Sequence, residues 1–400
     1  MKYDFTSIID RKGKDAIAVD NIGRKNWGNE PNAPREGFDA IPMWVADMNF
    51  ATSPSITDAL KKRIEHPLYG YFNDSDEFYN AIINWQTKRH GAVGLTKEQI
   101  AVESSVHGGV TTVIKALTNP GDNVFLHSPY YMGFDSDVAY IGRNAVFSEL
   151  KKDENGSYRM DFEDMEKVLK ENNVHLAIFC SPHNPAGRVW TKDELAKALA
   201  VFEKCDCDVV CDEIWADLIY EDRAHTPMYL MNDWAKEHVV CVYGLGKTFN
   251  LAGFAGAYSI SFSKRIREKV GFVVYNHLDV LFMHALIGAY NEVGYEWTDE
   301  LRSVLHENCK YAVEHIRNNY EGVTVPMPEG TYMIFLDCTE YCEKNGISID
   351  ELIEAGWDVG VGWQDGRRFR GPCHIRMNLA SPYSKIVEAF DRLDKYVFKK

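Results

Sequence analysis

Three polar side chains follow the ends of short apolar runs in this sequence. Asp212 comes directly after one run, Lys247 stands shortly after the run at residues 239–243, and Asn184 follows a third. Parallel strands end at a common edge of their sheet, and ligands of open α/β sheets bind at that edge. We therefore expect a carboxylate, an amine and an amide to meet in one site.

A fourth run, which begins at Val102, leads into Ser104-Ser-Val-His-Gly-Gly and then into a helical pattern. Free N–H groups at the start of a helix bind phosphate. Pyridoxal phosphate requires such N–H groups, an amine that forms a Schiff base and an acid that keeps its ring nitrogen protonated. Each residue taken alone has another explanation. Asn184-Pro185 is typical of a turn, Asp212 could cap a helix, and Lys247 could be a solvated surface charge. Their joint order favours a site for pyridoxal phosphate.

Two competing sites are disfavoured. The Gly-Lys-Thr at residues 246–248 resembles the end of a nucleotide-binding P-loop, but Cys241 occupies the position where that motif requires its first glycine. Cys205, Cys207 and Cys211 lack the second pair of ligands that a zinc site needs. We expect neither a nucleoside triphosphate site nor a metal.

The apolar runs alternate with helical patterns between about residues 96 and 281, which predicts an α/β fold with a mainly parallel sheet. The strand-like runs lie at 123–127, 174–180, 208–211 and 239–243, and residues 191–204 form a helical pattern that opens with a capping box.

After about Leu281 the pattern changes to a long helix over 298–318, a strand near 331–337 and helices near 349–355 and 384–398. This order predicts a smaller α+β domain. The first fifty residues show little periodicity, and we expect them to pack across both units. We place the large domain at residues 50–285 and the small domain at residues 1–49 and 286–400.

The composition restricts the partners of this chain. Its 400 residues carry 44 Lys+Arg against 59 Asp+Glu, a net charge of -15, with no basic run. Nucleic acids and anionic membranes are therefore disfavoured. No apolar stretch is long enough to span a membrane, and the N-terminus lacks the apolar core of a secretory signal. The nine cysteines, an odd number, favour reduced thiols and a cytoplasmic protein.

Six stretches of the sequence resemble the MalY/PatB-type cystathionine beta-lyases, which are fold-type I pyridoxal-phosphate enzymes of the class I/II aminotransferase group. The resemblance covers essentially the whole chain and implies the fold of the transferases that depend on pyridoxal phosphate (PLP). The stretches are Pro42-Met-Trp-Val-Ala-Asp-Met, Tyr69-Gly-Tyr71, Ser181-Pro-His-Asn-Pro-Ala-Gly-Arg, Asp212-Glu-Ile, Lys247-Thr-Phe-Asn-Leu-Ala-Gly and Arg376-Met-Asn-Leu-Ala.

The resemblance implies a role for each matching residue. Lys247 would bind the cofactor as a Schiff base and later remove the α-proton of the substrate. Asp212 would pair with the ring nitrogen, and Asn184 would bind the phenolic oxygen. Tyr131 would stack on the ring, with Tyr130 as a rival. Arg376 would hold the substrate carboxylate with two hydrogen bonds.

The resemblance also implies how the phosphate is bound. Gly108 and Gly109, together with His107, would approach it, and Thr248 is a further candidate. Tyr71 would reach the phosphate in a neighbouring subunit, which predicts a homodimer with shared sites.

Four positions depart from the family pattern. Gly244 and Gly246 replace serines that contribute hydroxyls to the phosphate, and Asn49 replaces an aspartate. Trp215, among the cofactor-binding positions, replaces a histidine, and its indole donates one hydrogen bond but accepts none.

The main functional prediction is a carbon-sulfur β-lyase. It would convert an L-amino acid such as cystathionine or cysteine into pyruvate, ammonia and a thiol. An aminotransferase acting on an L-amino acid is the second hypothesis, because it would use the same lysine, aspartate and arginine. A weakly catalytic regulatory protein that binds pyridoxal phosphate is the third, motivated by the glycines at 244 and 246 and by Trp215.

Overall fold

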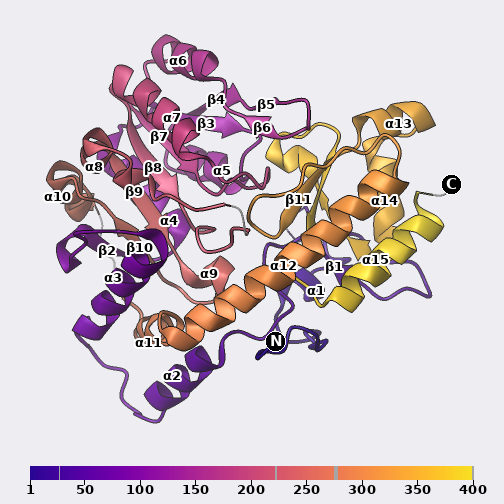
Figure 1. The fold of residues 1–400 in the computed structure, drawn as a ribbon, viewed down its shortest axis with the longest axis horizontal. Helices are drawn as coiled ribbons and strands as arrows, with labels where there is room; N and C mark the ends of the chain where they lie inside the picture. The colour runs from indigo at the N-terminus through magenta and orange to yellow at the C-terminus, as the bar shows by residue number, and fades with distance from the viewer. Residues whose placement is uncertain (27, 221–222, 274–277, 399–400) are drawn as a thin grey trace.

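The computed structural model describes residues 1–26, 28–220, 223–273 and 278–398 (Figure 1). A central sheet of seven strands runs in the order β2-β10-β9-β8-β7-β3-β4. β10 pairs antiparallel with β2 and β9, and the other neighbours are parallel. The predicted, mainly parallel α/β sheet is confirmed. Its strands are β2 (Ile100–Glu103), β3 (Asn123–Ser128), β4 (Asn144–Glu149), β7 (Leu176–Cys180), β8 (Asp208–Asp212), β9 (Val239–Tyr243) and β10 (Ala257–Ile260).

Helices cover both faces of this sheet. Val210 of β8 packs into an apolar cluster with α4, α5 and α10, whereas its neighbours Val209 and Cys211 pack into the cluster on the other face, with α6 and α7. Successive strand residues point to opposite faces, so a run without polar residues is needed to fill both. The helices are α4 (Val106–Leu117), α5 (Gly133–Tyr140), α6 (Phe162–Glu171), α7 (Lys192–Lys204) and α10 (Lys264–Val273).

A second, smaller group of elements contains the antiparallel sheet β11-β14-β13, which lies with α12, α14 and α15 beside the central sheet (Figure 1). The predicted α+β unit is therefore present. Its elements are α12 (Glu292–Asn319), β11 (Met333–Asp337), α13 (Thr339–Asn345), α14 (Ile349–Asp358), β12 (Val361–Gly362), β13 (Gln364–Asp365), β14 (His374–Asn378) and α15 (Tyr383–Tyr396).

The N-terminal segment packs along this smaller group and reaches the larger one. The Lys2 backbone N–H donates to Glu300 of α12, and the Phe5 ring packs against Trp297. Further along, the Met48 N–H donates to Asn250, which lies between β9 and β10 of the central sheet. The remaining elements are α1 (Ile17–Asp20), β1 (Ile41–Pro42), α2 (Pro54–Ile64), α3 (Asp76–His90), β5 (Lys151–Lys152), β6 (Tyr158–Arg159), α8 (Asp233–His238), α9 (Leu245–Thr248) and α11 (Val280–Ala289).

Local capping decides where two predicted helices begin. The long helix starts at Glu292, ahead of the predicted 298, because the side chain of Asn291 accepts a hydrogen bond from the Gly294 N–H. The pair Ser53-Pro54 predicts the start of α2, and the structure confirms it, with Ser53 as the N-cap residue and Pro54 as the first helical residue. The Ser53 hydroxyl bonds that of Ser55 and not a backbone N–H of the helix.

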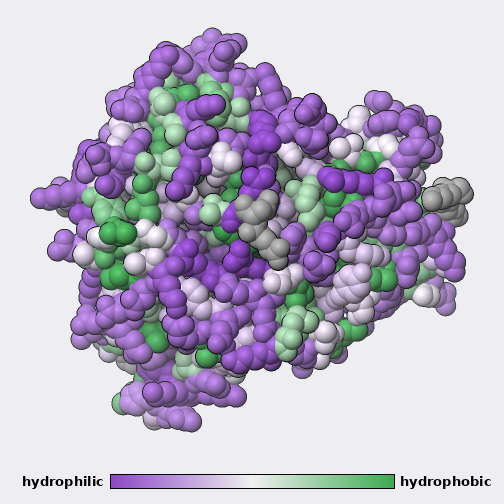
Figure 2. All heavy atoms as spheres, in the orientation of Figure 1, coloured by the Kyte–Doolittle hydropathy of each residue, from purple (hydrophilic) through white to green (hydrophobic). Residues whose placement is uncertain are grey.

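Hydrophilic residues cover most of the face shown in Figure 2, as expected for this strongly charged chain. Among the described residues, no helix combines the length and the apolar character that a membrane span requires.

Arg188 joins the two groups of elements through a buried ion-pair network. Its guanidinium lies 2.8 Å from Glu194 and 2.9 Å from Glu329, and it also donates to the Tyr158 carbonyl. Arg188→Ala should lower the free energy of unfolding by about 3 kcal/mol, because the two carboxylates lose their buried cation and keep only the more exposed Arg159 and Arg223. The exposed pair of Lys170 and Glu166 supplies the control. Lys170→Ala should cost less than about 1 kcal/mol in the same urea titration, and equal losses would contradict the buried role of Arg188.

Candidate active site

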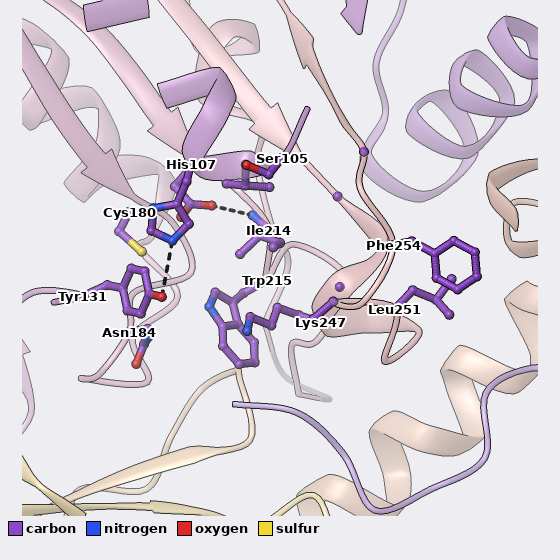
Figure 3. A pocket seen from close by; sticks show the side chains of 16 residues that line it. Ser105, His107, Tyr131, Cys180, Asn184, Ile214, Trp215, Lys247, Leu251 and Phe254 are labelled. Atoms are coloured by element: carbon purple, nitrogen blue, oxygen red, sulfur yellow. Dashed lines mark hydrogen bonds between the residues drawn. The ribbon is translucent and has the colours of Figure 1, made fainter. Parts of the chain in front are cut away.

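A cavity of about 250 Å³ opens where β7, β8 and β9 end, beside the first turn of α4. Figure 3 shows side chains from these separate segments pointing into it. Six of the residues predicted for the site line this cavity, and so do the two glycines at 244 and 246. The six are His107, Tyr131, Asn184, Asp212, Trp215 and Lys247.

Lys247 lies on the short helix α9, directly after β9. Its ammonium donates to the Ala46 carbonyl at 2.8 Å and lies 5.5 Å from the centre of the Trp215 ring. Burial lowers the pKa of Lys247 to about 8, and repulsion from the positive charge of Arg376 is the second cause of this shift. A lysine with this pKa supplies a neutral amine near pH 7 in a useful amount, as a nucleophile or a base requires.

Asp212 is the last residue of β8, and its side chain is 5% exposed. The Ile214 N–H donates to Oδ1 at 3.0 Å. Burial raises the pKa of Asp212 to about 6, although this N–H and the nearby His107 and Lys247 favour the charged form. A buried carboxylate of this kind is stabilised by a cationic N–H group that enters the cavity.

Arg376, on β14, is not among the residues that line the cavity, but it contacts Asn184, which does line it. Nη1 donates to the Asn184 side-chain oxygen at 3.2 Å, and Nη2 donates to Gln364 and to the Trp44 carbonyl. Its side chain is buried, its Nε has no hydrogen-bond partner, and it pairs with no carboxylate of the described residues. Burial lowers the pKa of Arg376 to about 10. A buried guanidinium without a counter-ion fits a carboxylate ligand.

The two neighbouring tyrosines point in different directions. Tyr131 lines the cavity, and its hydroxyl lies 3.3 Å from His107 Nε2 (Figure 3). Tyr130 instead donates its hydroxyl to Asp135 at 2.6 Å. Asp137 binds the other ring nitrogen of His107 and raises the pKa of this histidine. Of the two rivals, the structure brings Tyr131 to the cavity.

The first turn of α4 presents different groups from those expected. The N–H groups of Gly108 and Gly109 donate to the Ser105 hydroxyl and carbonyl, so both are used within the helix. Ser105, Val106 and His107 line the cavity in their place. We did not single out Ser105 from the sequence, although a serine that directly precedes a helical pattern is a recognisable N-cap signal.

Two further predicted residues lie elsewhere. Thr248, the last residue of α9, is buried, and its hydroxyl donates to Asp217 at 2.9 Å. Tyr71 lies between α2 and α3, where it is fully exposed and outside the cavity of its own chain. The structure therefore does not bring these two residues to the cavity.

Two of the positions that depart from the family pattern, Trp215 and Asn49, make defined contacts in the structure. The Trp215 ring packs edge-on against Tyr332, with centres 4.7 Å apart, and forms a wall of the cavity. The side-chain oxygen of Asn49 accepts from Arg11 at 2.8 Å, and Arg11 also pairs with Asp47. Because Asn49 is uncharged, Asp47 supplies the only negative charge among the three side chains of this group.

The fold and this cavity agree with a known class of proteins. Residues 41–393 match the family model of aminotransferase class I and II, and the chain belongs to this family. Cystathionine beta-lyase PatB of Bacillus subtilis is 32% identical over 84% of this chain and 89% of its own length.

Two solved structures are similar over almost the whole chain. A PLP-bound putative aminotransferase from Clostridium difficile 630 is 31% identical, with a TM-score of 0.90 over 99% of this chain and 100% of its own. Cystalysin from Treponema denticola, whose structure contains pyridoxal 5'-phosphate, is 28% identical, with a TM-score of 0.89 over 99% of this chain and 98% of its own.

Proposed function

We propose that this protein is a pyridoxal-phosphate-dependent carbon-sulfur β-lyase acting on an L-amino acid. The observation that carries the proposal is the meeting of Lys247, with its lowered pKa, and the buried Asp212 in one cavity. The similarity to a protein named cystathionine beta-lyase favours elimination over transamination.

The cavity fits this cofactor on its own chemistry. Asp212 would hold the ring nitrogen, Asn184 the phenolic oxygen, Tyr131 the ring face, and the first turn of α4 the phosphate. When bound, pyridoxal phosphate supplies an electron sink for the electron pair released at the α-carbon of the substrate. Gly244 and Gly246 offer no hydroxyl, so phosphate binding depends on Ser105 and on backbone N–H groups.

The residues of this chain move the proton and orient the substrate. Lys247 Nζ takes the α-proton, a role that its lowered pKa permits near pH 7. The Arg376 guanidinium holds the α-carboxylate and so directs the α-hydrogen toward the lysine. With one water, a thioether amino acid then yields a thiol, pyruvate and ammonia, and no oxidant or reductant is needed.

L-Cystathionine tests this function directly. Sustained pyruvate release from the cofactor-loaded protein, with an unchanged visible spectrum after turnover, is the expected result. Conversion of the cofactor to its amine form without pyruvate, reversed by a 2-oxo acid, would instead establish an aminotransferase. Tight cofactor binding without turnover of cystathionine, cysteine or other L-amino acids would favour the regulatory protein.

We also propose a cytoplasmic homodimer. Several large apolar side chains are exposed on the connection between α2 and α3, namely Leu68, Tyr69, Tyr71 and Phe72, which supports a protein partner for this loop. In this proposal Tyr71 binds the phosphate in the neighbouring subunit. The nine cysteines are all free, which suits a reducing compartment. Sedimentation of the loaded protein tests the dimer.

Arg376→Lys should separate substrate binding from chemistry. A lysine keeps the charge but cannot make two parallel hydrogen bonds to a carboxylate. We expect KM for cystathionine to rise about 10- to 100-fold, with a smaller change in kcat. Arg367→Lys is the matched control, because Arg367 forms exposed ion pairs with Asp350 and Asp365. An unchanged KM in Arg376→Lys would exclude this arginine as the carboxylate ligand.

A further inference from the structure

Another buried carboxylate, Asp217, accepts three hydrogen bonds and forms an ion pair. The hydrogen-bond donors are Trp85 Nε1 at 3.0 Å, His90 Nε2 at 2.9 Å and Thr248 Oγ1 at 2.9 Å, and Arg89 Nε forms the ion pair at 3.3 Å. Burial alone would raise the pKa of Asp217, but the bonds from His90 and the charge on Arg89 lower it to about 2. Asp217 is therefore a fixed anion near neutral pH.

One of these three hydrogen-bond donors, Thr248, belongs to the turn that carries the reactive lysine. Thr248 directly follows Lys247 in α9, a helix of four residues. Gly244 caps this helix and Gly246 lies within it, and neither has a side chain to anchor the turn. So short a helix depends on tertiary contacts for its conformation. Leu245 and Phe249 supply buried apolar contacts, but apolar contacts are not directional and do not fix the orientation of the turn. The hydrogen bond from Thr248 is directional and does fix it.

The acceptor of this bond belongs to the segment that carries the other catalytic group. Asp212 ends β8 and Asp217 follows five residues later on the same segment, whereas Lys247 follows β9. The bond between Asp217 and Thr248 therefore links the two strand ends whose side chains must face the same ligand. The other two donors and the ion-pair partner Arg89 all come from α3, so these contacts fix Asp217 against that helix.

We propose that Asp217 is a positioning residue that fixes Lys247 relative to Asp212 by holding the hydroxyl of Thr248. This inference rests on the proposed function, because it assumes that Lys247 and Asp212 act on one cofactor. This proposal also gives the Thr248 hydroxyl a function other than binding the phosphate. Asp217 touches neither cofactor nor substrate in this proposal.

The test compares variants that differ in one hydroxyl. Thr248→Val removes the donor at nearly constant shape, and Thr248→Ser retains it. The apo-proteins are mixed with pyridoxal phosphate, and the visible band of the lysine-bound cofactor is followed in time. Borohydride reduction and peptide mass spectrometry then identify the labelled lysine. We expect Thr248→Val to slow labelling of Lys247 about 10-fold and to lower kcat up to about 10²-fold with little change in KM, whereas Thr248→Ser stays within about 2-fold of the wild type.

Two further variants separate positioning from general stability. Trp85→Phe removes a different donor from Asp217 and should lower the melting temperature without slowing the labelling of Lys247. Asp217→Ala should slow labelling as Thr248→Val does, and the double variant should be no slower than the slower single variant, because both substitutions remove the bond between these two side chains. Equal labelling by Thr248→Val and Thr248→Ser, or losses that follow only the melting temperature, would overturn the inference.

The labelling readout does not depend on the substrate. If the wild type releases no pyruvate from any amino acid but Thr248→Val still slows labelling relative to Thr248→Ser, the lyase proposal fails and the positioning role of Asp217 stands.

Discussion

Lys247→Ala should abolish turnover of cystathionine, lowering kcat at least about 10⁴-fold. The substitution removes the amine that binds the cofactor and takes the α-proton, and among the described residues no other lysine lines the cavity. Pyruvate release in a coupled assay measures the loss. The visible band of the lysine-bound cofactor should disappear from the same sample.

The matched control is Lys264→Ala, because Lys264 is exposed on α10 and its side chain is 82% accessible. This variant should keep both the rate and the visible band. A small primary amine added to Lys247→Ala should restore part of the rate, since the truncated side chain leaves space beside Trp215. Full turnover by Lys247→Ala without added amine would show that another group performs the chemistry.

The buried strands were predictable because their signal is local. Residues 239–243 form β9 with the predicted bounds, since every position of this strand is buried and apolar. The polar residues after each strand were also predictable, because the edge of a parallel sheet gathers them. Lys247, Asp212 and Asn184 accordingly line one cavity.

Contacts between distant segments were not predictable from local patterns. The Ala46 carbonyl accepts a hydrogen bond from Lys247, yet nothing in the sequence marks a particular backbone carbonyl as an acceptor. The Thr248 hydroxyl was equally ambiguous, because its direction depends on Asp217 and hence on how two strand ends pack. Tyr130 and Tyr131 were inseparable for the same reason. The domain boundaries at 49/50 and 285/286 stay a proposal.

Asp212→Asn should lower kcat about 10³-fold, because an amide does not hold a protonated ring nitrogen as a carboxylate does. The control is Asp233→Asn, since the Asp233 carboxylate is fully exposed on α8. The visible band should persist in Asp212→Asn, because Lys247 is intact, and this persistence separates the variant from Lys247→Ala. Unchanged turnover would show that the ring nitrogen has another partner.

Asp212→Asn, which lowers the activity of the loaded enzyme, should stabilise the cofactor-free protein at high pH. Burial raises the pKa of Asp212 from 3.8 to about 6, so the folded state loses stability as the pH rises through this interval and the carboxyl ionises. An amide does not ionise, and the stability of apo Asp212→Asn relative to the wild type should therefore be greater near pH 8 than near pH 4. Thermal melts at both pH values measure this difference. Loading with pyridoxal phosphate should reduce it at the higher pH, because in the wild type the cofactor supplies the cationic partner that the buried carboxylate lacks. A difference that does not change with pH would mean that Asp212 carries no buried charge in the apo-protein.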